Sequence, residues 1–365
     1  MKFGSLKVAQ FKRWATLVVV LLSFVLIGTF SVGMSTASVV GPGNLNKIPS
    51  IVTSCTTGAD PILAGFDPAD GYLYVGNSGN ETSNNGSISV VAPSCDPIRT
   101  IETGAQSYPC GVVYDPLIHE ALIADEGLRD GYLLKGASIV RTISLGGPQY
   151  HGPCALAWDP AIGSVLVADQ GKGIDLVHLT LSTGKLRIDT QLDAFDKGSQ
   201  TLVTLVADGY IFCANQDAGT QVKVFNASTL EYIGSYSLDG FGTPISFAWD
   251  PLNQTAVLVM GANTVSREVA FLAADGIPTH QFSYTLLHAR DILGGGAYAV
   301  SYSPATKDVY LASFSGDDIW IMSPVGSLSH VYVDGSHGFD YLIYNSNNQD
   351  IYAGGFTGNL DVLGR

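Results

Sequence analysis

The chain has 365 residues, of which 46% are hydrophobic and 14% charged, and its formal net charge at pH 7 is −14. This negative balance argues against a nucleic-acid-binding protein, because phosphate backbones are bound by clustered positive charge. The 42 glycines and 16 prolines favour many short strands joined by tight turns, so the chain is predicted to be all-β.

The N-terminal segment, residues 1–37, has the features of an export signal. Lys2, Lys7, Lys12 and Arg13 precede an uncharged stretch, residues 15–34. Twenty helical residues rise about 30 Å, enough to cross a membrane. The small residues at 35–37 equally fit a secretory signal that is cleaved near Ala37. Residues 1–37 are thus predicted to be a signal peptide or a membrane anchor, residues 38–46 a linker, and the location extracellular or at the cell surface.

One short unit recurs over residues 47–365. It consists of an apolar strand that ends on an aromatic residue, an Asp-Pro or similar turn, and a second apolar strand. The aromatic residues are Phe66, Tyr114, Trp158, Trp249, Tyr302 and Tyr344. The widest interval, between Trp158 and Trp249, holds one more copy at residues 202–213, with an Asp-Gly turn. Each unit has room for four short strands, the content of one propeller blade, so the chain is predicted to be a seven-bladed β-propeller.

The two ends of the repeat region are predicted to complete each other. After Tyr344 only two further strands fit, so the last blade lacks its outer strand. One spare strand, residues 48–54, precedes the first blade. If the spare strand pairs with residues 359–363, it closes the ring and covers two open sheet edges. Residues 47–365 are therefore expected to form a single domain.

The units resemble the YVTN family of β-propeller repeats, which occurs in many exported archaeal and bacterial proteins. The resemblance is carried by the Asp-Pro turns and by the strands Gly71-Tyr72-Leu73-Tyr74-Val75-Gly76-Asn77 and Asp308-Val309-Tyr310-Leu311-Ala312. It covers about residues 47–365 and implies the propeller architecture. It does not imply one activity, because the family includes binding, surface-layer and enzymatic members.

Candidate ligand-binding residues lie in loops that would surround one mouth of the propeller channel. His151 and His337 each stand seven residues before the aromatic residue of their blade. A longer segment before the sixth blade adds His288, Arg290 and Asp291. Arg290 is a candidate to hold an anionic ligand through two hydrogen bonds. The alternatives are that the histidines are solvated loop residues and that Arg290 pairs with Asp291 on the surface.

Four polar residues at the ends of second strands form a candidate cation site. Their oxygens suit a hard cation such as calcium, and no other cofactor is predicted. The alternative is that each side chain caps its own turn. The four residues are Asn77, Asp125, Asp169 and Asn215.

The five cysteines leave the pairing open. Cys110 and Cys154 both follow a proline at the start of an inner strand in adjacent blades, so a disulfide between them is the candidate. Cys213 is predicted to be a buried apolar side chain. The chain lacks a Cys-x-x-Cys sequence, which excludes c-type haem and the usual zinc ribbon.

Four glycosylation sequons fall in predicted turns or loops, and the exported location is what gives them weight. They begin at Asn80, Asn85, Asn226 and Asn253.

The expected function is a non-enzymatic binding or scaffold module for an extracellular protein, a glycan or a small ligand. Any contact with a membrane is expected only through the N-terminal segment, and nucleic acid is not an expected partner. No serine-nucleophile elbow, phosphate-binding loop or His-Glu-x-x-His motif occurs. The alternative is a propeller enzyme of the lactonase or lyase type that uses His151, His337 or Arg290.

Overall fold

A computed structural model of the protein describes residues 49–79, 85–145, 152–169, 173–180, 185–192, 201–215, 221–238, 240–263, 266–288, 296–314, 316–333 and 338–364. The predicted signal or anchor, its apolar stretch 15–34, and the predicted linker lie outside these residues. Within the described part of the chain, no helix has the length and hydropathy needed to cross a membrane.

The described residues form seven four-stranded antiparallel sheets. The first contains β2 (Pro61–Phe66), β3 (Leu73–Asn77), β4 (Asn85–Val91) and β5 (Pro97–Ala105). The second contains β6 (Pro109–Asp115), β7 (Glu120–Asp125), β8 (Asp130–Lys135) and β9 (Ser138–Ser144). The third contains β10 (Pro153–Asp159), β11 (Ser164–Asp169), β12 (Gly173–Thr180) and β13 (Lys185–Leu192). The fourth contains β14 (Thr201–Ala207), β15 (Tyr210–Asn215), β16 (Gln221–Asn226) and β17 (Tyr232–Ser237).

The remaining sheets continue the pattern, and the last borrows a strand from the other end of the chain. The fifth contains β18 (Thr243–Asp250), β19 (Thr255–Asn263), β20 (Ser266–Ala273) and β21 (Tyr284–His288), with a 3-10 turn, η1 (Ile277–Thr279), before β21. The sixth contains β22 (Ala297–Ser303), β23 (Asp308–Ser313), β24 (Asp318–Met322) and β25 (Leu328–Tyr332). The seventh contains β26 (Tyr341–Tyr344), β27 (Ile351–Gly354), β28 (Asn359–Gly364) and β1 (Ser50–Thr56).

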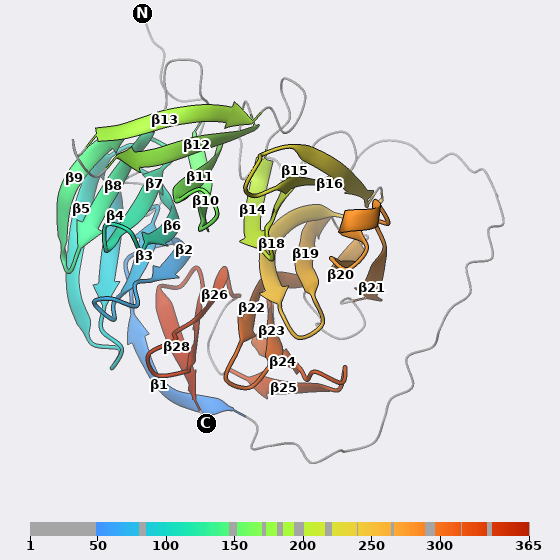
Figure 1. Ribbon diagram of the computed structural model, residues 1–365. Helices are drawn as coiled ribbons and strands as arrows, with labels where there is room; N and C mark the ends of the chain where they lie inside the picture. Colours follow the sequence, from blue (N-terminus) through green and yellow to red (C-terminus); the bar gives the residue numbers. More distant parts are fainter. Residues whose placement is uncertain are drawn as a thin grey trace, which may run out of the picture. The chain divides into compact units, whose positions relative to one another are not determined.

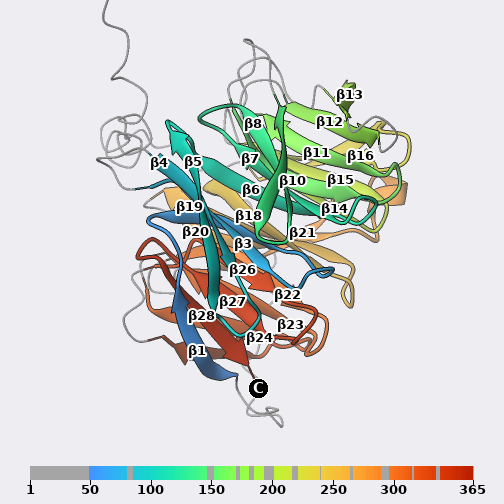
Figure 2. The same cartoon turned by 90° about the vertical axis from the view of Figure 1, so that its left-hand side faces the viewer.

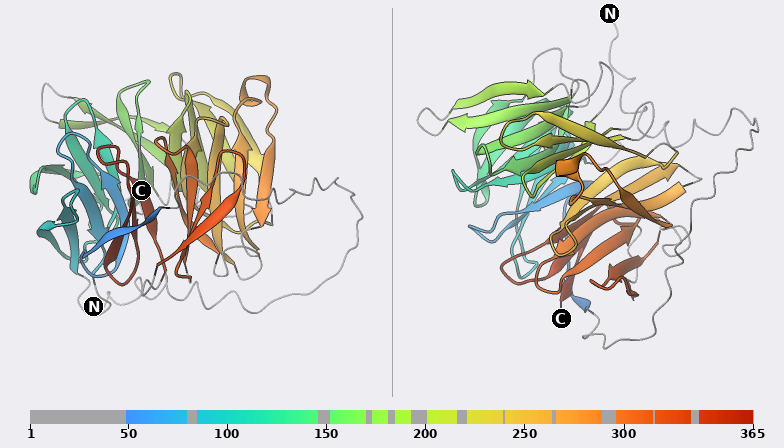
Figure 3. Two further views of the ribbon diagram at one scale, coloured as in Figure 1. Left: turned by 90° about the horizontal axis from the view of Figure 1, so that it is seen from below. Right: turned by 45° about the vertical axis from the view of Figure 1, so that its right-hand side comes forward.

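The sheets contact one another through their first strands (Figures 1 and 3). Each first strand contacts that of the following sheet, from β2 through β6, β10, β14, β18 and β22 to β26, and β26 contacts β2. The second strands β3 and β23 are buried along their whole length. A strand covered on both faces takes apolar residues at successive positions. The core is thus a series of apolar layers between neighbouring sheets.

The repeated turn after each first strand has a local physical cause. The aspartate that follows the aromatic residue accepts a hydrogen bond from the backbone N–H two residues further on. The oxygen–nitrogen distance is 2.8 Å for Asp67 and Ala69 and 3.0 Å for Asp250 and Leu252. This Asx turn reverses the chain into the second strand. It explains why the aromatic–Asp-Pro pattern marks one sheet after another.

Strand β1 lies at the edge of the seventh sheet and pairs antiparallel with β28, as Figure 2 shows. Cys55 stands opposite Leu360 in this pairing, and Thr56 opposite Asn359. The pairing covers the open edge of β28. Such an edge would otherwise expose a row of unpaired N–H and C=O groups.

The disulfide differs from the one expected. Cys55 is bonded to Cys95, whereas Cys110 and Cys154 are both free. Cys95 lies in the turn between β4 and β5 and has a positive φ of 70°. Its Sγ is 3.9 Å from the carbonyl oxygen of Leu360, the residue paired with Cys55. The turn therefore carries Cys95 onto the neighbouring sheet, directly beside Cys55, and the expected Cys110–Cys154 bond is wrong.

Candidate functional site

Aromatic side chains gather where the first strands end. They line a cavity of about 490 Å³ together with small and aliphatic residues. We call this cavity the aromatic opening. The aromatic residues that line it at the strand ends are Phe66, Tyr114, Trp249, Tyr302 and Tyr344. These five side chains are only partly buried. The opening thus presents several flat apolar faces to whatever enters it.

The polarity of the aromatic opening comes mainly from hydroxyl groups. The phenol oxygen of Tyr114 is 2.9 Å from Nδ1 of His119. Ser301, Tyr302 and Tyr344 are also lining residues. The lining residues include no carboxylate, histidine or basic side chain. Such a surface suits stacking and hydrogen bonding with a neutral ligand more than proton transfer.

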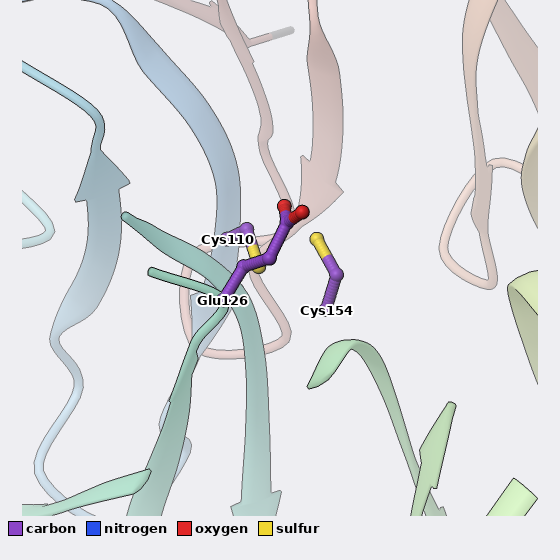
Figure 4. A group of neighbouring side chains, drawn as sticks. All are labelled: Cys110, Glu126 and Cys154. Carbon is purple, nitrogen blue, oxygen red and sulfur yellow. The ribbon is translucent and has the colours of Figure 1, made fainter. Parts of the chain in front are cut away.

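A second cluster lies at the opposite ends of the first strands. Its members are Cys110, the second residue of β6, Cys154, the second residue of β10, and Glu126, which follows β7. Figure 4 shows the three side chains pointing into one space. One sulfur or oxygen atom of each lies within 4.8 Å of the others. We call these three residues the thiol–carboxyl cluster.

Burial raises the pKa values of two members of the thiol–carboxyl cluster, Cys110 and Glu126. Loss of contact with water, followed by the hydrogen bond and charge of Cys154, raises the pKa of Cys110 well above its usual value. Burial, with a smaller effect from the charge of Asp125, raises the pKa of Glu126 to about 7. Burial and the charges of the same three residues also raise the pKa of Tyr108. Two thiols, a carboxyl group and a phenol therefore share one enclosed environment.

Two further residues extend this environment across the channel. Asp340 directly precedes β26, and burial raises its pKa to about 8, with a smaller effect from Asp60. Among the described residues its Oδ2 has no hydrogen-bond partner. Burial also raises the pKa of Tyr298, and the charges of Asp340 and Cys154 add to the effect. Tyr298 precedes the middle of β22 in the sixth sheet and Cys154 lies in the third, so the electrostatic environment of Tyr298 includes residues from other sheets.

The ligand-binding residues expected at this end are described only in part. His151, His337, Arg290 and Asp291 lie outside the described residues. His288 ends β21, the outermost strand of the fifth sheet. Its side chain is 67% exposed, and its Nδ1 is 3.2 Å from Oε1 of Glu268. His288 therefore lies on the outer rim of its sheet and not at the channel mouth, because the mouth is formed by first strands.

The candidate cation ligands are held within their own sheets. Asp125 accepts hydrogen bonds from the N–H groups of Tyr108 and Leu128, at 2.8 and 2.9 Å, and from the hydroxyls of Ser107 and Tyr132. A carboxylate has about four acceptor positions, so Asp125 retains none for a cation.

The two asparagines of the set are also enclosed. The Nδ2 of Asn77 donates to Oγ of Ser89 at 3.1 Å, and the side chain of Asn215 is buried. The side chain of Asp169 lies outside the described side chains. The bond from the N–H of Leu128 to Asp125 matches the turn-capping alternative. Asn77 instead bonds a neighbouring strand of its own sheet, and among the described residues its Oδ1 and that of Asn215 have no hydrogen-bond partner.

The sequons occupy different kinds of position. Asn80 lies outside the described residues, and Asn85 is the first residue of β4. Asn226 accepts hydrogen bonds from the N–H groups of Ser228 and Thr229, both at 2.9 Å. The Nδ2 of Asn253 donates to Asp250 at 2.7 Å. Asn226 and Asn253 therefore stabilise their turns in the unmodified chain, and glycosylation at the four sequons stays a prediction.

Glu126, Asp340, Tyr108 and Tyr298 were not predicted as site residues. A weak signal was present for two of them. Glu126 directly follows the cap residue Asp125, and Asp340 stands three residues after His337. The propeller topology places an acidic residue at one mouth when it directly follows a second strand, as Glu126 does, or directly precedes a first strand, as Asp340 does, and that rule would have found both.

Comparisons with known proteins identify the fold. No protein-family model matches the chain, and no curated protein matches it in sequence. Among solved structures, it is similar to the Cps50 (Swd1) β-propeller domain of Myceliophteria thermophila, with a TM-score of 0.66. The match covers 86% of this chain and 99% of that domain at 13% sequence identity. The fold is a β-propeller. An identity this low carries no further conclusion.

Proposed function

We propose that this β-propeller is an exported, seven-bladed binding module of the YVTN type that takes a neutral glycan at the aromatic opening. The ring of contacts between first strands and the pairing of β1 with β28 support seven blades closed by the N-terminal strand. Rigid blades of this kind hold binding groups in fixed positions.

The observation that carries the proposal is the composition of the aromatic opening. Partly exposed rings of Tyr114, Trp249 and Tyr302 line one cavity with Ser301. Sugar rings have apolar faces bordered by hydroxyl groups. Aromatic faces and phenolic hydroxyls complement both features, and neither requires a charged group. The proposed role is non-enzymatic recognition through these aromatic faces and hydroxyl groups.

The lactonase or lyase alternative stays a prediction. Its groups, His151, His337 and Arg290, lie outside the described residues.

Glycan-array screening of the full-length protein, followed by calorimetry with the best ligand, tests the proposal. Removing the ring of Trp249 or Tyr302 by substitution with alanine should weaken binding about tenfold or more, the usual effect of losing an aromatic anchor. Tyr332→Ala, which removes an exposed tyrosine from the outer strand β25, is the matched control and should leave binding unchanged. Equal affinity in all three variants, or binding to peptides and not to glycans, would contradict the proposal.

A further inference from the structure

We propose that Cys110, Glu126 and Cys154 hold one zinc-type divalent metal ion at the end of the channel opposite the aromatic opening. Among the described residues, these three form the group of metal-ligating side chains whose ligand atoms all lie within 4.8 Å of one another. In tetrahedral zinc sites, Zn–S bonds are about 2.3 Å and Zn–O bonds about 2.0–2.2 Å, which separates neighbouring ligands by roughly 3.5–3.8 Å. The ligand atoms would have to move closer together by up to about 1 Å to reach that spacing.

The donor set selects the class of metal. Two thiolates and one carboxylate suit zinc, because thiolates prefer softer ions and calcium or magnesium prefer oxygen ligands. Three protein ligands also leave the fourth tetrahedral position for water or for an incoming ligand, as in open zinc sites. Cys154 and Glu126 are only partly buried, whereas Cys110 is fully buried. The ion would therefore enter from the channel side and rest against Cys110.

The backbone around the cluster is shaped to bring the ligands together. A Cβ on Gly111 would lie 1.8 Å from the carbonyl oxygen of Cys154, so only a glycine allows β6 and β10 to approach so closely beside Cys110. A Cβ on Gly152 would lie 2.4 Å from Cγ of Glu126, and Gly152 has a φ of +129° that favours glycine. Gly111 follows Cys110 in the sequence, and Gly152 lies beside Glu126 in space. Their positions indicate that the approach of the three ligands is built into the blades.

The carboxyl group of Glu126 lacks a partner among the described residues. Among the described residues, no hydrogen bond or ion pair to the Glu126 carboxylate is present, and the nearby charge of Asp125 is of the same sign. A divalent cation would supply the missing positive charge. Because thiolates and a carboxylate are the binding forms, the ion would displace the protons of the two thiols and any proton on Glu126. Zinc affinity should accordingly rise with pH.

Metal analysis of the untagged full-length protein tests this site. After incubation with zinc and removal of free ion, mass spectrometry should find one zinc per chain. Replacing zinc by cobalt should give the intense thiolate-to-metal absorption of tetrahedral sulfur ligation. Cys110→Ser and Cys154→Ser should each abolish that absorption, and Glu126→Gln should weaken zinc binding on the order of 100-fold. Cys213→Ala, at a buried free cysteine in β15, is the matched control and should keep both signals.

A measurement on the unchanged protein covers the case in which a variant fails to fold. Zinc should protect Cys154 from alkylation, as located by peptide mass spectrometry, and a chelator should restore its reaction. Alkylation at the same rate with and without zinc would overturn the proposal. So would a cobalt spectrum that survives Cys110→Ser in folded protein, or a Cys110–Cys154 disulfide in the protein as isolated.

Discussion

Cys55 and Cys95 join the seventh sheet to the first, with a Cα–Cα distance of 5.6 Å. Cys55 belongs to β1, the outer strand of the seventh sheet, and Cys95 to the turn between the two outer strands of the first sheet. The bond therefore spans the place where the two ends of the repeat region meet. The hydrogen-bonded pairing of β1 with β28 and the disulfide therefore both hold β1 in its place.

Removing this disulfide should destabilise the propeller. The bond closes a loop with a sequence separation of 40 residues, for which the chain-entropy model gives about 4 kcal/mol of stabilisation. Cys55→Ala/Cys95→Ala should lower the free energy of unfolding by about 3–4 kcal/mol in urea titrations. Reductant should shift the unchanged protein by a similar amount and leave the double variant unaffected. A reductant effect of equal size in both proteins would contradict the assignment.

The repeat could be predicted from the sequence because its cause is local. An aromatic residue, an aspartate whose Oδ1 binds the N–H two residues on, and an apolar second strand occur within about a dozen residues, as at Asp67 and Asp250. Periodicity and turn chemistry operate over that range. Six of the seven described first strands accordingly end at or directly after the predicted aromatic residue, and the fourth, which has no aromatic residue there, ends at Ala207 before its predicted Asp-Gly turn.

The contacts between blades could not be predicted in the same way. The partner of Cys55 depends on the left-handed turn at Cys95 and on the contact between the first and seventh sheets. Glu126 meets Cys154 only because β6 and β10 approach closely at Gly111. Their spacing in the sequence matches no metal-binding motif. Residues brought together by packing between separate blades give no local pattern, and Cys110 and Cys154 were recognised as neighbours but assigned the wrong chemistry.

Asp125 should matter for stability and not for calcium binding. Its carboxylate accepts hydrogen bonds from two backbone N–H groups and from the hydroxyls of Ser107 and Tyr132. Asp125→Ala would leave these buried donors without an acceptor, and such losses cost about 1–3 kcal/mol each. We expect a loss of about 3 kcal/mol or more in urea unfolding, whereas Asp208→Asn in an exposed turn should be near neutral. Calcium-dependent stabilisation that disappears in Asp125→Ala would contradict the capping role.

Gly111 should tolerate no side chain. The clash of an added Cβ with the Cys154 carbonyl, at 1.8 Å, involves backbone on both sides, so β6 and β10 must separate. Gly111→Ala should therefore destabilise the protein by roughly 3 kcal/mol or more, within the range of overpacking and backbone strain. Gly136→Ala is the control, because its Cβ would have no neighbour within 4 Å and only its φ of +57° opposes the change. Thermal melts that rank Gly136→Ala as the more damaging substitution would refute the close-approach argument.

Asp340 should make the stability of the propeller depend on pH. Its pKa is about 8 in the folded protein because of burial, against about 3.9 in an unfolded chain. Between these values the folded state keeps a proton that the unfolded state has released. The free energy of unfolding should therefore fall as the pH rises through this window. The stabilising contribution is fully present below about pH 4 and lost above about pH 8.

Replacement of the carboxyl by an amide isolates this effect. Asp340→Asn cannot ionise, so it should be more stable than the unchanged protein at pH 9, by an amount on the order of a few kcal/mol, and similar to it at pH 4. Urea titrations across that range measure the difference. Glu126, with a pKa of about 7, adds a decline of the same sign in both proteins and cancels in the comparison. Asp96→Asn, at an exposed position in the turn before β5, should follow the unchanged protein at every pH. If the free energy of unfolding changes with pH in the same way in Asp340→Asn and in the unchanged protein, the raised pKa is contradicted. In that case Asp340 would already be ionised in the folded protein at pH 5 and would release no proton as the pH rises further.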